Sequence, residues 1–178
     1  MQGLMMDYQL TIDRILEHAY RMYPNKNIIT KLPDGSLHSY TYSNFYKRVK
    51  RLANVLKNLG VEKGDRIGTF SWNNYQHLEL YYAIPCYGAI IHTINIRLSE
   101  EQLVYIINHA EDKIIFIDAP LLPLFEKIVD QLTTVKQYVI FNSDKLAETK
   151  LPNVLYYDEL ISKADDDFVW DITDENLA

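Results

Sequence analysis

The 178-residue sequence contains a single cysteine, Cys86, inside the apolar stretch LELYYAIPCYGAII. One cysteine excludes an intrachain disulfide and a zinc site built from several thiolates, and its apolar surroundings predict a small core residue. The sequence also lacks a run of about 18 apolar residues and a basic segment followed by an apolar one, so it predicts neither a membrane span nor a secretory signal. We therefore expect a soluble, cytoplasmic protein.

Basic residues are missing from the C-terminal end. Residues 164–178 contain five Asp, one Glu and no Lys or Arg, so they carry the whole formal net charge of −6 and leave the preceding 163 residues neutral. A neutral folded part lacks the basic excess that nucleic-acid binding requires. We expect an α/β unit over residues 1–164, followed by an acidic linker over residues 165–178.

Several signatures of nucleotide and catalytic sites are absent. The sequence has no G-x-G-x-x-G, no G-x-x-x-x-G-K-[ST] and no G-x-S-x-G, and its five histidines show no pair at metal-ligand spacing. Motif spacing alone therefore assigns no catalytic residue and no metal ligand.

The first third of the sequence predicts a helix, a hairpin and a second helix. Thr11 can cap a helix that Pro24 ends, and Pro33-Asp34-Gly35 predicts the turn between strands at 27–32 and 36–40. Residues 43–58 predict an amphipathic helix that ends at Gly60, where a residue that tolerates positive φ is favoured. Gly64-Asp65 then predicts a tight turn into an apolar strand.

Strands and helices alternate from this turn onward. The apolar patterns predict strands at 66–70, 89–94, 113–117, 137–141 and 154–156, and helices at 74–87, 99–109, 121–131 and 158–163. Ser99 and Gln102 have capping-box spacing, and Pro85 should kink its helix or end it early. Short apolar strands alternating with helices predict an α/β fold, with a parallel sheet flanked by helices on both faces after an N-terminal helix and hairpin.

Polar and aromatic residues follow two of the predicted strands. Ser71, Trp72 and Asn73 come after strand 66–70, and Asn95 and Arg97 come after strand 89–94. Ligands of open α/β sheets bind outside the carboxyl ends of the strands, so these five residues are candidates for binding a substrate or cofactor. In the alternative interpretation, Asn73 or Asn74 caps the next helix and Arg97 pairs with a nearby carboxylate.

Five short motifs occur in a characteristic order between residues 40 and 117. They are Thr-Tyr-x-x-Phe, Gly-Val-x-x-Gly-Asp-Arg-Ile, Gly-Ala-Ile-Ile, Asn-Ile-Arg-Leu and Glu-Gln-Leu-x-Tyr-Ile-Ile. In order and spacing, this stretch resembles the N-terminal part of the large domain of the adenylate-forming (AMP-binding) superfamily, and most closely its medium- and long-chain fatty-acyl-CoA synthetases.

The resemblance implies an enzyme that uses ATP and Mg²⁺ to convert a fatty acid to acyl-AMP and then transfers the acyl group to coenzyme A. The family's Ser/Thr/Gly-rich phosphate loop with its lysine normally follows shortly after a stretch like DITDENLA, which ends this sequence, and its adenylation lysine belongs to a later C-terminal domain. The resemblance thus implies an N-terminal fragment that is inactive alone, binds no cofactor by itself, docks onto the remainder of the synthetase and can self-associate as a homo-oligomer. Two alternatives stay open: an aryl-acid, amino-acid or luciferase-like adenylating ligase, and a non-catalytic interaction module derived from this fold.

Overall fold

The computed structural model describes residues 8–142 and 149–171, and it contains two sheets. Strands β1 (Asn27–Lys31) and β2 (Leu37–Thr41) form an antiparallel hairpin. The main sheet has the order β4-β3-β5-β6-β7, and all of its pairings are parallel. Its strands are β3 (Arg66–Phe70), β4 (Ile90–Thr93), β5 (Ile114–Asp118), β6 (Gln137–Phe141) and β7 (Val154–Tyr156). The predicted hairpin and parallel sheet are both confirmed.

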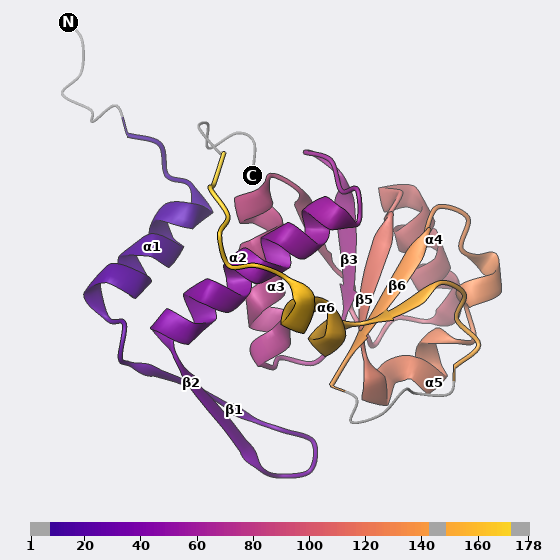
Figure 1. Cartoon of the computed structure of the whole chain (residues 1–178). Coiled ribbons are helices and arrows are strands. Elements are labelled where there is room, and N and C mark those ends of the chain that lie inside the picture. Colours follow the sequence, from indigo (N-terminus) through magenta and orange to yellow (C-terminus); the bar gives the residue numbers. More distant parts are fainter. Residues whose placement is uncertain (1–7, 143–148, 172–178) are drawn as a thin grey trace, which may run out of the picture.

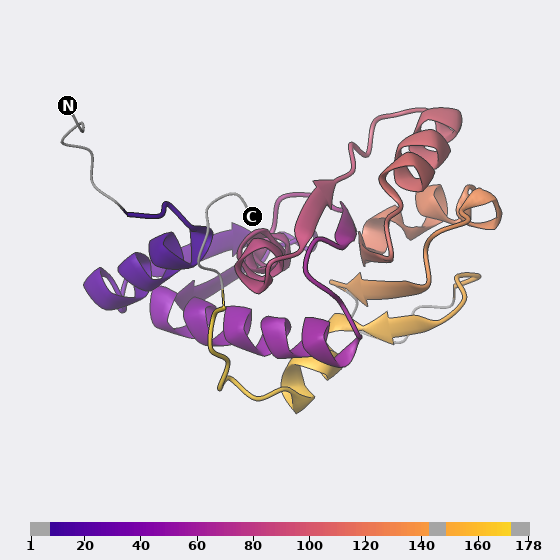
Figure 2. The same ribbon diagram turned by 90° about the horizontal axis from the view of Figure 1, so that it is seen from above.

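Helices cover both faces of the main sheet, as predicted (Figures 1 and 2). One face carries α2 (Tyr42–Asn58), α3 (Tyr75–Tyr87) and α6 (Tyr157–Lys163), and α1 (Ile12–Met22) packs on α2 and α3; the other face carries α4 (Glu100–Ala110) and α5 (Leu122–Phe125). Each face of the main sheet packs against its own hydrophobic core, and the side chains of β5 alternate between them. Phe116 packs on the α2 side and Ile117 on the α4 side. Burial of both faces explains why this strand reads as a continuous apolar run.

The joint between α2 and β3 is built from glycines and one aspartate. Gly60 and Gly64 have φ values of +74° and +82°, which L side chains rarely adopt. Asp65 accepts a 2.9 Å hydrogen bond from the backbone amide of Glu62 and lies 2.6 Å from Nζ of Lys113. The carboxylate thus closes the turn and ties the start of β3 to the start of β5, so this joint has a structural role.

Two predicted helix starts differ in their capping. Ser99 and Gln102 form the expected reciprocal capping box at the start of α4. Thr11 occupies the N-cap position of α1, but its side chain accepts no capping bond, and its buried hydroxyl has no hydrogen-bond partner among the described residues. The predicted N-cap position of Thr11 is therefore confirmed, whereas the capping bond from its side chain is not formed.

Two predicted helices contain prolines, and their outcomes differ. Pro85 does not end α3 early: the helix continues to Tyr87 and stops at Gly88, because a proline in the last turn removes only one backbone bond. The predicted helix over residues 121–131 is instead the one-turn α5 between two 3₁₀ turns, Ala119–Leu121 and Val129–Gln131. Pro120 and Pro123 lie in the first turns of these short helices, where an amide has no intrahelical acceptor in any case, so they do not explain why α5 ends at Phe125.

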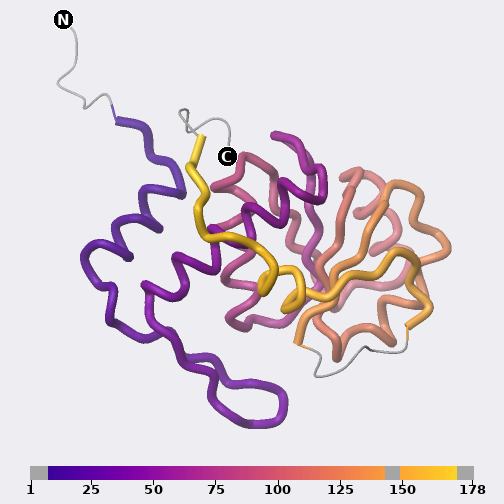
Figure 3. The backbone as a smooth tube through the Cα atoms, in the orientation of Figure 1, coloured from indigo at the N-terminus to yellow at the C-terminus, as the bar shows by residue number. Residues whose placement is uncertain are grey.

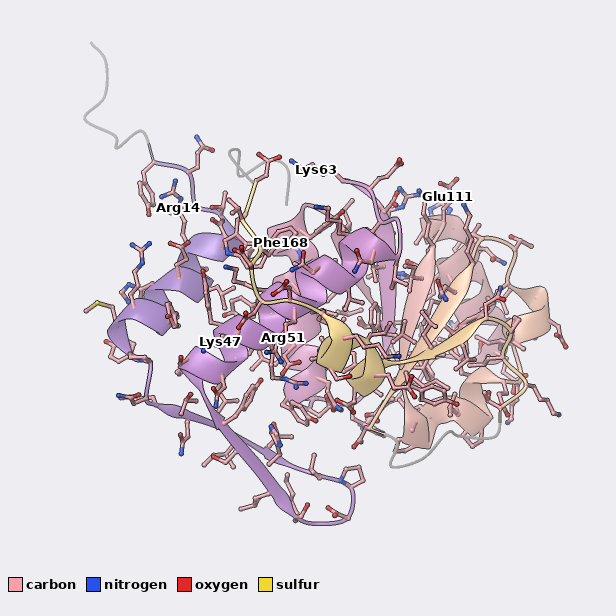
Figure 4. All side chains as sticks on the ribbon, in the orientation of Figure 1. Arg14, Lys47, Arg51, Lys63, Glu111 and Phe168 are labelled. Carbon is pink, nitrogen blue, oxygen red and sulfur yellow. The ribbon has the colours of Figure 1, made fainter. Side chains whose placement is uncertain are left out.

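The C-terminal segment (residues 164–171) lies along α2 and α3 (Figures 1 and 3). Nδ2 of Asn54 donates a 2.8 Å hydrogen bond to the backbone carbonyl of Asp165, and Phe168 contacts the ring of Tyr87. Nζ of Lys63 donates 2.8 Å hydrogen bonds to the carbonyl and the carboxylate of Asp171. Lys63 and Phe168 are labelled along this path in Figure 4. The first half of the predicted linker is thus packed on the fold, and residues 172–178 lie outside the described part.

Candidate functional site

A cleft of about 330 Å³ opens at the carboxyl edge of the main sheet. It lies between the tip of the β1–β2 hairpin and the loops that follow β3, β5 and β6. Its lining residues are Lys31, Leu32, Pro33, Trp72, Asn73, Asn74, Asp118, Pro120 and Asn142. Apolar walls with a few polar groups at this edge are typical of ligand sites in open α/β folds.

The loop after β3 supplies the aromatic wall of the cleft. The side chain of Trp72 is 49% exposed, and its backbone carbonyl accepts a 2.6 Å hydrogen bond from Oγ of Ser71. Asn74 caps α3, since its Oδ1 accepts a 2.9 Å hydrogen bond from the amide of His77. Of the two capping candidates, Asn74 therefore has the structural role, which leaves Asn73 exposed in the cleft.

Asp118 holds the loops of the cleft together. This residue ends the central strand β5, and its side chain is buried. Its two carboxylate oxygens accept hydrogen bonds from Nδ2 of Asn74 (3.1 Å) and Nδ2 of Asn142 (3.0 Å). Burial raises the pKa of Asp118, while hydrogen bonds from Asn142, the Trp72 backbone and Asn74 act in the opposite direction. One carboxylate thus connects the loops that follow β3, β5 and β6.

Asn142 has a backbone conformation suited to this contact. It follows β6 directly and has a φ of +58°, in the left-handed region that asparagine tolerates better than most residues. The sharp turn that this φ produces brings its amide back to Asp118.

Asn95 and Arg97 lie outside the cleft. They follow β4, which pairs in parallel with β3, so they stand at the same edge of the sheet as Trp72. Oδ1 of Asn95 accepts a 3.0 Å hydrogen bond from the backbone amide of Arg97, which closes the turn into α4. Arg97 is exposed, and no carboxylate of the described residues pairs with it. The proposed ion pair of Arg97 is therefore not formed within this part of the chain.

Asp118, Asn142 and the three hairpin residues of the cleft are not among the site residues predicted from the sequence. Asp118 ends the apolar run IIFID, and a carboxylate at the end of a buried strand is a signal that could have identified it. Nothing in the local sequence indicates that Lys31, Leu32 and Pro33 reach the sheet edge, because the docking of the hairpin depends on tertiary packing.

A second polar cluster lies inside the α2–α3–α6 layer. The carboxylate of Glu79 is fully buried and accepts hydrogen bonds from Nε of Arg48 (2.6 Å) and from the hydroxyl of Tyr157 (2.5 Å). Burial raises the pKa of Glu79, and the charge and hydrogen bond of Arg48 lower it. Each partner comes from a different helix, so the cluster ties three helices together and has a structural role.

The described residues do not form a metal centre of three or more side-chain ligands. Within residues 8–142 and 149–171, no group of three His, Cys, Asp or Glu side chains could hold a metal ion. His77 and His92 each contact one polar side chain, Thr69 at 3.0 Å and Asp112 at 2.7 Å. In the same part of the chain, no helix is long and apolar enough to cross a membrane.

Comparison with known proteins gives consistent matches across the chain. The model of the family described as "AMP-binding enzyme" matches residues 16–168. The whole chain is 44% identical to part of a 3-methylmercaptopropionyl-CoA ligase from Ruegeria lacuscaerulensis and 37% identical to part of a medium-chain-fatty-acid–CoA ligase from Ectopseudomonas oleovorans. In both alignments, the chain spans 33% of the relative. A long-chain-fatty-acid–CoA ligase from Thermus thermophilus is 43% identical over 78% of the chain and 26% of its own length.

Solved structures share the fold at lower sequence identity. An anthranilate CoA ligase in complex with anthranoyl-AMP superposes on 96% of the chain, and 30% of the ligase is covered, with a TM-score of 0.76 and 21% identity. Coronafacic acid ligase from Pectobacterium brasiliense superposes on 92% of the chain, and 32% of the ligase is covered, with a TM-score of 0.79 and 20% identity. The chain therefore spans about a third of the length of the proteins that it matches.

Proposed function

Because the chain belongs to the AMP-binding enzyme family, we propose that it forms the N-terminal portion of an ATP-dependent acid–thiol ligase that acts on medium- or long-chain fatty acids. The observation that carries this proposal is the alignment of the complete chain, at 37% identity, with a medium-chain-fatty-acid–CoA ligase. The long-chain ligase at 43% identity supports the same substrate class.

The chemistry of this reaction explains why such an enzyme needs ATP. A carboxylate is a poor acyl donor because its leaving group would be oxide, and adenylation replaces oxide with AMP before coenzyme A attacks. Mg²⁺, when bound, would stabilise charge on the phosphates. The described residues contain no group of three His, Cys, Asp or Glu side chains that could hold a metal ion, so we assign them no step that involves Mg²⁺.

The role proposed for this chain is to build the sheet and to line one side of a ligand cleft. Trp72 offers a half-exposed indole, and Asn73 offers an amide that the fold leaves free to face a ligand. An aromatic face beside polar groups suits an amphipathic ligand such as an acyl chain or the pantetheine arm of coenzyme A. Ser71 would orient this loop, while Asn95 and Arg97 would contact a ligand that extends along the sheet edge.

A shorter acid is the second candidate substrate. The two relatives named 3-methylmercaptopropionyl-CoA ligase are 44% and 38% identical over the complete chain. An aryl acid is a weaker candidate, since trans-cinnamate:CoA ligase from Petunia hybrida is 31% identical over 86% of the chain. We also propose that the ligase is located in the cytoplasm and that it self-associates.

A chimeric ligase tests the proposed function. The matching third of the Ruegeria lacuscaerulensis ligase would be replaced by these 178 residues, and acyl-CoA formation would be measured with 3-methylmercaptopropionate and with fatty acids of increasing chain length. We expect CoA thioester formation that depends on ATP and on the acid. A folded chimera that forms no thioester with any of these acids would contradict the proposal.

The isolated 178-residue chain serves as the control. We expect no ATP–pyrophosphate exchange from it with any acid, because the 178 residues contain no Ser/Thr/Gly-rich loop with a lysine of the kind that the family resemblance implies. Exchange by the isolated chain would overturn the proposal that it is inactive alone.

A further inference from the structure

The cleft is lined by one positive and one negative side chain, and only the positive one is exposed. Among the lining residues that the structure describes, Lys31 is the only cation and Asp118 is the only carboxylate. Asp118 is 1% exposed, and its two oxygens already accept hydrogen bonds from Asn74 and Asn142. The Asp118 carboxylate therefore organises the wall of the cleft and is not available to pair with Lys31.

Lys31 has no counter-ion in the described part of the chain. It is exposed at the end of β1, and no carboxylate of the described residues forms an ion pair with its ammonium group. Asp34, in the turn of the same hairpin, accepts hydrogen bonds from the amide (2.9 Å) and the hydroxyl (2.7 Å) of Ser36 and does not line the cleft. The charge of Lys31 is thus uncompensated at the rim of the cleft.

The amino end of α3 adds positive potential to the same cleft. α3 begins at Tyr75, directly after the cleft residue Asn74, and its first turn contains no acidic residue. The amino end of a helix carries roughly half a positive charge, because its first amides have no partner within the helix. Lys31 and this helix end therefore both favour an anion in the cleft.

The remaining surfaces of the cleft suit a ligand with an apolar body. Leu32, Pro33, Pro120 and the half-exposed indole of Trp72 line it, and the exposed amide of Asn73 is positioned to face a ligand. Its volume of about 330 Å³ is near the lower limit for small-molecule pockets, which is about 300 Å³. A cleft of this size accommodates a medium-chain acid and not the whole of coenzyme A.

We propose that Lys31 binds the carboxylate of a medium-chain acid in this cleft, while the indole of Trp72 packs against the alkyl chain and the amide of Asn73 donates to a carboxylate oxygen. This inference rests on the proposed function, which supplies the class of substrate, and it adds the residue that recognises the charge of that substrate. Hydrogen bonds between an ammonium group and a carboxylate are stronger than those between neutral groups. The hairpin thus contributes to binding as well as to the shape of the cleft.

A binding titration of the 178-residue chain tests this assignment without catalysis. The fluorescence of Trp72, in a Trp170→Phe background, is followed during the addition of decanoate below its critical micelle concentration, with decan-1-ol as the uncharged control of equal length. We expect decanoate to bind about tenfold more tightly than decan-1-ol, which corresponds to about 1.4 kcal/mol. Equal affinities for the two ligands would overturn the inference.

Substitution of Lys31 identifies the source of this preference. We expect Lys31→Met to raise the Kd for decanoate about tenfold and to leave that for decan-1-ol unchanged, whereas Lys31→Arg should keep the preference because it keeps the charge. The matched control is Lys57→Met, which removes an exposed charge on α2 outside the cleft and should change neither Kd. An equal loss of decanoate binding in Lys57→Met would reduce the effect of Lys31 to net charge and overturn the assignment.

The chimeric ligase provides a second measurement. We expect Lys31→Met to raise the KM for decanoate about tenfold with a much smaller change in kcat, because Lys31 contributes to binding of the acid. Unchanged Kd and KM in Lys31→Met would overturn the inference while thioester formation by the chimera still supported the proposed function. If coenzyme A, and not decanoate, changes the fluorescence of Trp72 in a way that depends on Lys31, the anion is a phosphate and the assignment of a carboxylate is wrong.

Discussion

The carboxylate of Glu79 on α3 has no exposed surface and accepts a 2.6 Å hydrogen bond from Nε of Arg48 on α2. The hydroxyl of Tyr157, at the start of α6, binds the other oxygen of the same carboxylate. A charge buried in this way is stable only while it is paired, because its removal from water costs several kcal/mol. This contact therefore makes the packing of α2, α3 and α6 mutually dependent.

Loss of the arginine should destabilise the fold strongly. We expect Arg48→Met to lower the free energy of unfolding by about 3–5 kcal/mol, because it leaves the Glu79 carboxylate buried without its cation. Urea denaturation of the 178-residue chain measures this change. The matched control is Arg21→Met, which breaks an exposed pair with Glu17 and should cost less than about 1 kcal/mol. Equal losses in the two variants would contradict a structural role for the buried pair.

Asp118 should be coupled energetically to Asn142. We expect Asp118→Ala to cost about 1–3 kcal/mol, because it removes a buried carboxylate that accepts hydrogen bonds from two half-buried amide donors. In a double-mutant cycle with Asn142→Ala, the interaction energy should be about 0.5–3 kcal/mol. The fluorescence of Trp72, measured in a Trp170→Phe background, should change with Asp118→Ala, since the loop that carries Trp72 loses its anchor. If the losses in free energy of unfolding of the two single variants add up to that of the double variant, and the fluorescence spectrum of Trp72 is unchanged, Asp118 does not organise the cleft.

Trp72 and Arg97 should affect catalysis more than stability. In the chimeric ligase, we expect Trp72→Ala and Arg97→Ala each to lower kcat/KM about tenfold, which corresponds to about 1.4 kcal/mol, at an unchanged melting temperature. Steady-state kinetics and thermal unfolding of the same preparations provide the comparison. A loss of stability without a loss of kcat/KM would assign both residues to the scaffold.

The hairpin should make stability depend on pH. His38 on β2 stacks on Tyr75 of α3 with ring centroids 3.8 Å apart, and its pKa is lowered from 6.5 by burial and by the charge of Arg48, with Asp158 acting in the opposite direction. A histidine with a lowered pKa in the folded state binds its proton more tightly when unfolded. Above about pH 6.5 the imidazole is neutral in both states and does not reduce the free energy of unfolding. As the pH falls from 6.5 toward the folded pKa of His38, proton binding by the unfolded chain lowers the free energy of unfolding.

The comparison of the wild type with His38→Phe isolates this contribution, because phenylalanine keeps the stacking on Tyr75 without a titratable group. We expect the free energy of unfolding of the wild type to fall relative to that of His38→Phe between pH 7.5 and pH 5. Urea denaturation at both pH values measures the difference. Parallel pH profiles for the two proteins would exclude His38 as the source.

Local patterns in the sequence predicted most of the elements because their causes are local. The apolar strands at 66–70, 113–117 and 137–141, the capping box of Ser99 and Gln102 and the helix end at Gly60 all depend on residues a few positions apart. Prediction was wrong for the continuous helix over residues 121–131, and the side chain of Thr11 makes no capping bond although the residue is the N-cap of α1. Among the five site candidates, only Trp72 and Asn73 line the cleft, and the roles of all five in ligand binding remain predictions.

The sequence by itself determined the fold class and the family, because periodicity, turn residues and ordered motifs are written along the chain. Tertiary structure alone decided the strand order, the docking of the hairpin tip on the cleft and the two buried carboxylates with their partners. Asp118 and Asn142 are 24 residues apart, and Arg48 and Glu79 are 31 residues apart. A buried charge finds its partner through the packing of whole elements, and no periodic pattern specifies which polar residues that packing will bring together.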